Sequence, residues 1–361
     1  MKTINENKVF IIAEAGVNHN GELELARKLV DIAADAGANA VKFQTFDAKK
    51  LATINAPKAI YQQQTTDTAE SQLEMLRKLE LPHEWHRELQ ERAHSRGIEF
   101  LSTAFDAHSL SFLEELDLPF YKVPSGELTN GPLLWQFARQ GRPLVVSTGM
   151  ATMSEVEQAL AVIAHALNSS LEPKTTDEIW RGWSDPTWRA SLQGRVTLLH
   201  CTSQYPTPIE ECNLRAMDTL RAFGLPIGYS DHTEGIMIPV AAVARGATLI
   251  EKHFTLDRTM SGPDHKASLE PLELAEMIKQ IRELQLALGD GAKCPQPSEW
   301  NTRQAARQCV VAAHDIVAGT ILSRDNLTTA RSDGGLSANE LWALVGTVAS
   351  QTYATGESIK R

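Results

Sequence analysis

The sequence predicts an α/β protein in which a (β/α)8 TIM barrel is followed by a small C-terminal domain. Short apolar or β-branched runs alternate with longer segments of helical period, which is typical of βα units around a parallel sheet. We count eight such runs before residue 290. Eight βα units within about 290 residues match the usual size of the barrel, whereas a doubly wound sheet more commonly has fewer strands.

The expected strands are short and bounded by turn residues. They span residues 9–16, 40–46, 99–105, 120–126, 143–149, 196–202, 227–232 and 248–254. The helices that we expect between them include residues 23–36, 83–95, 109–116, 155–167 and 272–288. The last of these places Leu274, Met277, Ile278 and Ile281 on one face, which is the stripe of a helix packed against a core.

Two connections are too long for simple loops of a barrel. Residues 47–80 follow the end of the second strand, so we expect them to roof the mouth of the barrel. Residues 168–195 contain Trp180, Trp183 and Trp188 and follow a helix, so we expect them on the opposite face in a structural role.

The chain divides into a barrel and a smaller module. We assign residues 1–290 to the catalytic barrel, residues 291–303 to a linker rich in glycine and proline, and residues 304–361 to the C-terminal domain. A domain of about 58 residues has a marginal core by itself, so docking against a barrel of its own or a partner subunit would help it.

Composition excludes several classes of protein. The 361 residues carry a formal charge of −10 with 42% hydrophobic residues, which disfavours a disordered chain and a nucleic-acid-binding protein. No apolar run is long enough to cross a membrane, and the polar start is not followed by a signal-peptide core. The four cysteines form no CxxC pair, so we expect reduced thiols in a cytoplasmic protein.

Polar residues gather where the predicted strands end, and in a barrel those ends build the active site. A lone serine or threonine at such a place is most simply a hydrogen-bonded interior residue. A cluster at nearly every strand favours a site instead. The segments concerned are 14–19, 42–44, 102–103, 122–127, 147–149, 202–206, 230–232 and 251–253.

Lys42 and Lys122 alternate with apolar residues on the second and fourth strands. If both side chains point inward, they place two ammonium groups at the barrel mouth, where they would suit a substrate carrying carboxylate, phosphate or both. One alternative is a Schiff-base lysine of a lyase, and another is a lysine that simply points to the surface.

His232 and His253 end the seventh and eighth strands, which are neighbours in a barrel. Two imidazole nitrogens can then approach one divalent ion, and the first strand brings Glu14 to the same side. Two histidines with an oxygen ligand suit a first-row divalent metal that acts as a Lewis acid. Each histidine could equally serve as a hydrogen-bonding residue or a general acid.

The ordered set of motifs resembles the sialic acid synthase family over nearly the whole chain. These motifs are IAEAGVNHNG at 12–21, VKFQT at 41–45, KVPSGE at 122–127, STGM at 147–150, YPTP at 205–208, GYSDHT at 228–233, EKHF at 251–254 and GPDH at 262–265. The C-terminal segment resembles that family's antifreeze-like domain, also called the SAF domain, which has a β-clip fold. The run 312–319 and Arg331 carry this second likeness.

The resemblance implies a condensation of phosphoenolpyruvate with an N-acylated mannose-type sugar and water, which yields a 2-keto sugar acid and phosphate. Carbon 3 of phosphoenolpyruvate attacks the open-chain aldehyde, and phosphate leaves through cleavage of a carbon–oxygen bond. We favour N-acetylmannosamine as the acceptor, which would make the protein an N-acetylneuraminate synthase. The alternative is a synthase of N,N'-diacetyllegionaminate, or of a related nonulosonate, that uses a 2,4-diacetamido hexose.

The resemblance also implies roles for individual residues. The divalent metal, Mn2+ or Mg2+, would be held by His232 and His253. Glu14 and Glu127 lie at acidic positions close to the reacting carbons, and one of them would handle water or a proton. Residues at substrate-binding positions are Lys42, Thr103, Lys122, Ser125, Ser147 and Ser230 for phosphoenolpyruvate and Gln44, Tyr205 and Asp264 for the sugar.

Arg331 matches an arginine that reaches the N-acyl group of the sugar from the partner subunit, so the resemblance implies a domain-swapped homodimer. Two other classes of protein stay open. A Schiff-base aldolase would use Lys42 or Lys122 as its nucleophile. A non-catalytic ice-binding or scaffold protein is suggested only by the C-terminal domain, and the charged strand ends argue against it.

Overall fold

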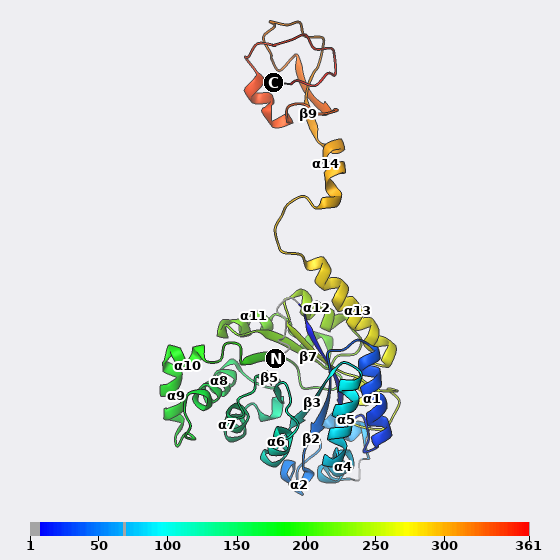
Figure 1. Ribbon diagram of the computed structural model, residues 1–361, viewed down its shortest axis with the longest axis vertical. Helices are drawn as coiled ribbons and strands as arrows, with labels where there is room; N and C mark the ends of the chain where they lie inside the picture. Colours follow the sequence, from blue (N-terminus) through cyan, green and yellow to red (C-terminus); the bar gives the residue numbers. More distant parts are fainter. Residues whose placement is uncertain (1–7, 68–69, 361) are drawn as a thin grey trace. The chain divides into compact units, whose positions relative to one another are not determined.

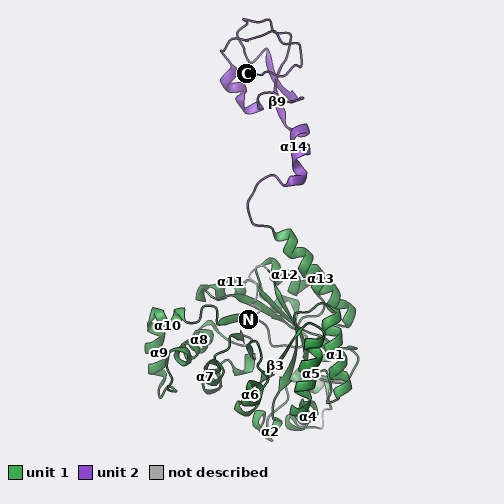
Figure 2. Ribbon diagram, viewed as in Figure 1, with its two compact units in different colours: residues 1–289 green, residues 290–361 purple. Residues whose placement is uncertain are grey.

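The computed structural model describes residues 8–67 and 70–360 of the chain. The chain forms two compact units, residues 1–289 and residues 290–361, shown in different colours in Figure 2. Within the described residues no helix is long and apolar enough to cross a membrane.

The first unit is built around an eight-stranded parallel sheet, seen at the centre of the ring of helices in Figure 1. Its hydrogen-bonded order is β3-β2-β1-β8-β7-β6-β5-β4, and the outer members β3 and β4 contact each other, so the sheet closes into a barrel. The predicted TIM barrel is therefore confirmed. The strands are β1 (Phe10–Gly16), β2 (Ala40–Thr45), β3 (Glu99–Ala104), β4 (Tyr121–Val123), β5 (Leu144–Ser147), β6 (Val196–His200), β7 (Ile227–Asp231) and β8 (Leu249–His253).

Helices surround the sheet (Figure 1). They are α1 (Leu23–Asp35), α2 (Ala48–Leu51), α3 (Ile60–Thr65), α4 (Gln72–Leu79), α5 (His83–Ser95), α6 (Ala107–Glu114), α7 (Gly131–Arg139), α8 (Met153–Asn168), α9 (Thr176–Ser184), α10 (Pro186–Ala190), α11 (Ala216–Leu220), α12 (Met237–Ala244) and α13 (Pro271–Leu288). Side-chain caps explain several starts: the Thr152 hydroxyl accepts from the Glu155 amide at α8, and Asn130 caps α7.

One predicted strand is much shorter in the structure. We expected a strand over 120–126, whereas β4 covers only Tyr121–Val123 and residues Ser125–Glu127 form a short 3-10 turn. Pro124 between them lacks the N–H that a further ladder hydrogen bond would need. The turn keeps Ser125 and Glu127 at the end of the strand, where the site lies.

Two apolar layers hold the barrel together. The larger one packs the outward-facing side chains of the strands against the helices. The smaller one fills the barrel interior and consists of Ile12, Ala40, Leu101, Phe120, Val145, Leu199 and Leu249, with Phe10 beside it. Gly228 faces this inner layer, and a Cβ there would lie 2.5 Å from the Leu199 side chain, so the interior has no room for more.

The two long connections contain helices. Residues 47–80 include α2, α3 and α4. Residues 168–195 include α9 and α10, which pack beside α8. The Trp183 indole N–H donates to Glu157 Oε1 at 2.9 Å, and Trp180, Trp183 and Trp188 all pack against the outer apolar layer. Residues 168–195 thus add two helices to the layer that surrounds the sheet, which is a structural role.

The second unit has its own small core. It contains α14 (Trp300–Ala306), the antiparallel pair β9 (Gln308–Ala312) and β10 (Leu327–Arg331), and α15 (Leu341–Leu344). Its buried cluster includes Val310, Ile316, Leu327 and Tyr353. The segment 291–303, which we expected as a linker, includes a 3-10 turn from Pro297 to Glu299 and the start of α14.

Candidate active site

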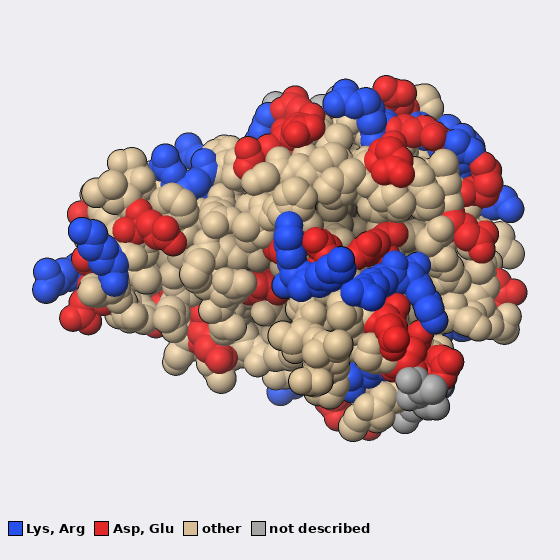
Figure 3. Space-filling model, turned by 90° about the horizontal axis from the view of Figure 1, so that it is seen from below, with Lys and Arg blue, Asp and Glu red and all other residues tan. Residues whose placement is uncertain are grey.

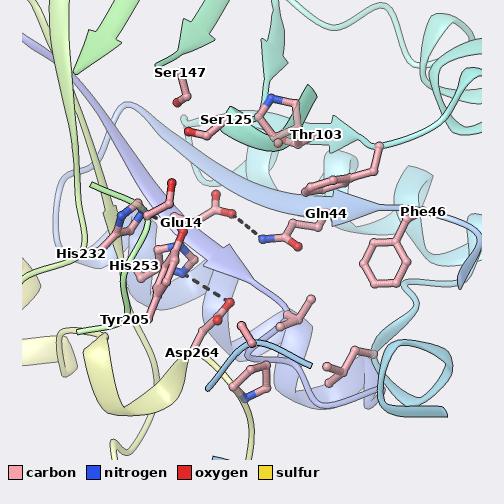
Figure 4. A pocket seen from close by; sticks show the side chains of 18 of the residues that line it. Glu14, Gln44, Phe46, Thr103, Ser125, Ser147, Tyr205, His232, His253 and Asp264 are labelled. Carbon is pink, nitrogen blue, oxygen red and sulfur yellow. Dashed lines mark hydrogen bonds and ion pairs between the residues drawn. The ribbon is translucent and has the colours of Figure 1, made fainter. Parts of the chain in front are cut away.

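A cavity of about 450 Å³ opens at the carboxyl ends of the barrel strands. Figure 4 shows part of its lining. All of the site residues predicted within the barrel line this cavity: Glu14, Lys42, Gln44, Thr103, Lys122, Ser125, Glu127, Ser147, Tyr205, Ser230, His232, His253 and Asp264. Its volume lies within the range that binds small molecules.

Arg331 is the one predicted site residue that belongs to the second unit. It ends β10 in the second unit, and its side chain is exposed. Its role stays a prediction.

The period of the strands explains why the polar side chains converge. Successive side chains of a strand alternate between its two faces, so a residue two positions after an inner apolar residue also points into the barrel. Ile12 is followed in this way by Glu14, and Ala40 by Lys42. The same step leads from Leu101 to Thr103, from Phe120 to Lys122, from Val145 to Ser147 and from Leu249 to Glu251. The apolar layer is therefore the floor of the cavity, and the polar residues lie directly above it.

Four ionisable side chains meet on this floor. The Lys42 ammonium lies 2.6 Å from Glu14 Oε2 and 3.6 Å from Glu251 Oε2, and the Lys122 ammonium lies 3.2 Å from Glu251 Oε1. Lys42 also donates to the Thr103 hydroxyl at 3.0 Å. All four groups are buried, and their formal charges balance. The two lysines therefore point inward, and the surface orientation considered for them is wrong.

Burial and pairing shift the pKa values of this cluster in opposite directions. Desolvation raises the pKa of Glu14 to about 7, although Lys42 counteracts it. Burial also opposes charge on Glu251, but Lys122 and Lys42 outweigh it and hold its pKa below its ordinary range. Burial opposes charge on Lys42 as well, yet the carboxylates of Glu14 and Glu251 raise its pKa. Glu14 is thus the member of the cluster that exchanges protons near neutral pH.

Glu251 is a residue that we did not assign to the site. It bridges both lysines and accepts a hydrogen bond from the Ser230 hydroxyl at 2.7 Å. The signal was present in the sequence, because Glu251 lies two residues before His253 and must share its face of the strand. Its partners, however, come from β2, β4 and β7, and their proximity could not be read from one strand.

Hydroxyl groups line the side of the cavity beside Lys122. The Ser125 hydroxyl accepts from the Gly149 amide at 3.1 Å and lies 3.2 Å from Cys201 Sγ. The buried Ser147 hydroxyl has no hydrogen-bond partner among the described residues. A Cβ on Gly149 would come within 2.2 Å of the Ser203 hydroxyl, so this space exists only because residue 149 is glycine. These donors beside an ammonium group suit an anionic oxygen.

His232 and His253 lie side by side in the cavity, with ring centroids 5.5 Å apart (Figure 4). His232 Nδ1 is 2.7 Å from the Thr202 carbonyl and donates to it, which leaves Nε2 to accept from the Tyr205 hydroxyl at 3.0 Å. Burial lowers the pKa of His232 to about 4. Burial, helped by His232 and Lys42, also holds the pKa of His253 well below its ordinary value. Both rings are therefore neutral at physiological pH, the form that binds metals.

A divalent metal at this pair of imidazoles would take a nitrogen of His253 and Nε2 of His232, which the Tyr205 hydroxyl would have to leave. Buried His253 Nδ1 has no hydrogen-bond partner among the described residues, and Asp264 Oδ2 lies 3.8 Å away from it. Gly16 has a φ of +52°, and a Cβ there would lie 3.2 Å from the His253 ring. Glycine therefore allows both this backbone conformation and the close packing of the ring. Within residues 8–67 and 70–360, no group of three or more His, Cys, Asp or Glu side chains could hold a metal. The fit therefore rests on the two histidines.

The two remaining acidic side chains have different surroundings. Glu127 Oε2 accepts from the Asn130 side chain at 2.7 Å and is only half-buried. Asp264 is buried, and desolvation raises its pKa to about 6.

Aromatic rings connect the insertion 47–80 to the histidines. The ring of Tyr205 lies 4.1 Å from His232 and 5.1 Å from Tyr61 of α3, measured between centroids. The insertion 47–80 thus contributes to the wall of the cavity, as expected for a roof.

Apolar side chains of that insertion and of the residues just after β1, β2 and β3 line another part of the cavity. We call the following group the apolar wall: Val17, Phe46, Leu51, Met75, Leu76, Leu79 and Phe105. Phe46 and Phe105 meet edge to face with centroids 6.0 Å apart. In Figure 4 Gln44 lies between Glu14 and Phe46, so the wall faces the part of the cavity away from the histidines.

The outer surface shows no single sign of charge on the face drawn in Figure 3. Basic side chains form a short band there, with acidic side chains on both sides among the described residues. This mixed surface differs from the basic stripe of a nucleic-acid-binding protein.

Comparisons with known proteins identify two matching models. The NeuB family model matches residues 29–293, and the SAF domain model matches residues 307–360. An N,N'-diacetyllegionaminic acid synthase of Campylobacter jejuni is 48% identical over 98% of this chain and 99% of its own length. One of Legionella pneumophila is 42% identical over 97% of this chain and 93% of its own. A solved N-acetylneuraminic acid synthetase of Leptospira borgpetersenii is 34% identical, covers 83% of this chain and 93% of its own, and has a TM-score of 0.66.

Proposed function

Because the chain belongs to the NeuB family and ends in a SAF domain, we propose that it is a phosphoenolpyruvate-dependent nonulosonate synthase. The observation that carries the proposal is the cavity lined by two buried lysines, by hydroxyl groups that include the unpaired one of Ser147, and by a pair of neutral imidazoles. The lysine side suits the carboxylate and phosphate of phosphoenolpyruvate. The imidazole side suits the aldehyde oxygen of an open-chain sugar.

The reaction forms one carbon–carbon bond and one carbon–oxygen bond, and it breaks one carbon–oxygen bond. Carbon 3 of phosphoenolpyruvate bonds to the aldehyde carbon, whose oxygen gains a proton. The oxygen of water bonds to carbon 2, its two protons pass to the former aldehyde oxygen and to the departing phosphate, and phosphate leaves with the bridging oxygen. We propose Glu14 rather than Glu127 for the proton or water step, since its pKa of about 7 lets it give and take a proton at neutral pH.

The acceptor that we propose is a 2,4-diacetamido hexose, which would give an N,N'-diacetyllegionaminate. The sequence motifs favoured N-acetylmannosamine, but the relatives that are 48% and 42% identical carry the name N,N'-diacetyllegionaminic acid synthase. The solved relative named for N-acetylneuraminic acid is 34% identical. The comparisons thus support the alternative better than the first choice.

The test measures both acceptors with the purified full-length chain. Phosphate release from phosphoenolpyruvate is expected with the 2,4-diacetamido sugar at a higher kcat/KM than with N-acetylmannosamine. Phosphoenolpyruvate labelled with 18O at the bridging position should yield labelled phosphate. Turnover of N-acetylmannosamine alone would overturn the choice of acceptor, and unlabelled phosphate would overturn the proposed bond cleavage.

A divalent metal, Mn2+ or Mg2+, is part of the proposal, with His232 and His253 as its protein ligands. When bound, it would act as a Lewis acid on the aldehyde oxygen. We expect chelation to abolish turnover and His232→Ala and His253→Ala to abolish metal binding in equilibrium dialysis. Full turnover by metal-free enzyme would contradict this part.

A Schiff-base aldolase is less compatible with the cavity. Its lysine must lose a proton to attack a carbonyl, whereas the neighbouring carboxylates raise the pKa of Lys42. Lys122 is likewise ion-paired, with Glu251. Borohydride reduction in the presence of pyruvate should therefore leave both lysines unlabelled, and a stable adduct on either would favour the aldolase.

We also propose that the active enzyme is a homodimer in which Arg331 of one subunit binds the N-acyl group of the sugar in the other. The exposed side chain of Arg331 is available for such a contact. A single charge-assisted contact of about 1.5–3 kcal/mol predicts that Arg331→Ala lowers kcat/KM for the acceptor roughly ten- to a hundredfold. Mixing the impaired Arg331→Ala and Lys122→Met chains should raise the activity above that of either variant alone, and failure would favour sites formed by one chain.

A further inference from the structure

The cavity changes character along the strands that form it. On β2 and just beyond it, the inward side chains are Lys42, Gln44 and Phe46, each two residues after the one before. On and after β3 they are Thr103 and Phe105. Both series run from polar groups near the floor to an aromatic ring at the mouth. A bound sugar that reacts at the floor can extend its other end toward these rings.

Helix α4 completes the apolar wall with one continuous face. Gln72, Met75, Leu76 and Leu79 all line the cavity, and their spacing places them on the same side of the helix. Met75 and Leu79 are buried in the cluster with Val17 and Phe46, while Leu76 is half-buried. This face of α4 therefore begins with the amide of Gln72 and continues with the side chains of Met75, Leu76 and Leu79.

This pattern matches an acylated amine better than a hydroxyl. A hydroxyl pressed against the apolar wall would lose hydrogen bonds to water without replacing them. An acetamido group has an amide that the side chain of Gln72 can pair with and a methyl that Met75 and Leu76 can cover.

We infer that the apolar wall and Gln72 form a specificity site for the second N-acyl group of the acceptor, the one on the half of the sugar far from the aldehyde. This inference rests on the proposed function, because it concerns the acceptor of that reaction. Phe46 and Phe105 close the aromatic side of the site, and α4 supplies its amide and its aliphatic side. Selection of the sugar is then made by the apolar wall with Gln72 and not by the charged floor.

The experiment compares the acceptor preference of wild type and variants, defined as the ratio of kcat/KM for the 2,4-diacetamido sugar to that for N-acetylmannosamine. Leu76→Asn puts a polar group into the wall and should lower the preference at least about tenfold, since a buried methyl discriminates by roughly 10–200-fold. Leu76→Met keeps the wall apolar and should preserve the preference. Leu51→Asn provides a second polar variant from another helix, should Leu76→Asn fail to fold.

Leu73→Asn is the matched control, because Leu73 is buried on the same helix but is not among the residues lining the cavity. It should lower stability without changing the acceptor preference. An unchanged preference in folded Leu76→Asn and Leu51→Asn would overturn the inference while leaving the proposed function intact. If wild type converts neither sugar with phosphoenolpyruvate, the proposed function fails and the inference fails with it.

Discussion

Two buried sets of ion pairs in the barrel differ in where they face. Glu14, Lys42, Lys122 and Glu251 form a network inside the barrel and line the cavity. Asp231 and Lys252 are register partners on β7 and β8, and their side chains lie 2.5 Å apart with no exposed surface. Because their neighbours His232 and His253 point into the cavity, this pair points outward toward the helices.

The two sets also differ in how completely the protein pairs them. Asp231 accepts from the Thr233 hydroxyl at 3.0 and 2.9 Å, and Lys252 also donates to the Thr233 carbonyl. In the cavity, Glu251 holds two lysines, and these ammonium groups face space that a ligand can fill. Buried charge alone therefore does not mark a site; buried charge beside an open cavity does.

The largest expected effect tests the cavity set. Lys122→Met removes an ammonium group from the proposed phosphoenolpyruvate side, so kcat/KM for phosphoenolpyruvate should fall about a hundredfold or more. Steady-state kinetics with saturating acceptor measure this, and circular dichroism checks that the variant folds. A near-normal kcat/KM would show that Lys122 only balances the charge of Glu251.

The next largest effect concerns the outward pair. Lys252→Met leaves the Asp231 carboxylate buried without its partner, so the free energy of unfolding should fall by about 3–5 kcal/mol. Urea unfolding provides the measurement, and Lys266→Met, at an exposed lysine, should change it by no more than about 0.5 kcal/mol. Recovery in the double variant Asp231→Leu/Lys252→Met would confirm that the loss comes from an unpaired charge, whereas wild-type stability in Lys252→Met would contradict it.

The pH dependence of stability should reveal the Glu14 carboxyl of the network that lines the cavity. The pKa of Glu14 is raised from an ordinary 4.5 to about 7 in the folded protein, so the folded state binds more protons than the unfolded state between these values. The contribution of Glu14 to stability is therefore complete below about pH 4.5 and is lost as the pH rises through 7. In urea unfolding, the free energy of unfolding of wild type should therefore fall relative to that of Glu14→Gln as the pH rises from 5 to 8. A constant difference would show that Glu14 is ionised throughout.

The smallest expected effect compares the hydroxyl groups that support each set. Thr233→Val removes a hydrogen bond to buried Asp231 and should cost about 1.5–3 kcal/mol in the free energy of unfolding. Ser230→Ala removes the hydrogen bond to Glu251 and should act mainly on KM for phosphoenolpyruvate, because Glu251 keeps both lysines. If Ser230→Ala instead lowered stability as much as Thr233→Val, the contrast between the two sets would not hold.

Much of the barrel and of its cavity could be predicted because both depend on local periodicity. The inner apolar residues and the polar residues two positions later follow one rule on every strand that carries them. Predictions failed where local chemistry interrupted the pattern, as at Pro124, or where residues of several strands combine, as at Glu251. The apolar wall was also missed, since its members lie just after three β-strands and on two separate helices of the insertion 47–80.

The amino-acid sequence by itself determined that this protein is a barrel with lysines, hydroxyls and histidines at its strand ends, because side-chain alternation and βα connectivity leave few other arrangements. Only the tertiary structure decided which of those groups pair. The distance from Lys42 to Glu14 and Glu251, the burial that makes both histidines neutral, and the apolar face of α4 toward the cavity all arise between segments far apart in the chain. Desolvation and ion pairing depend on such distances, and no local pattern encodes them.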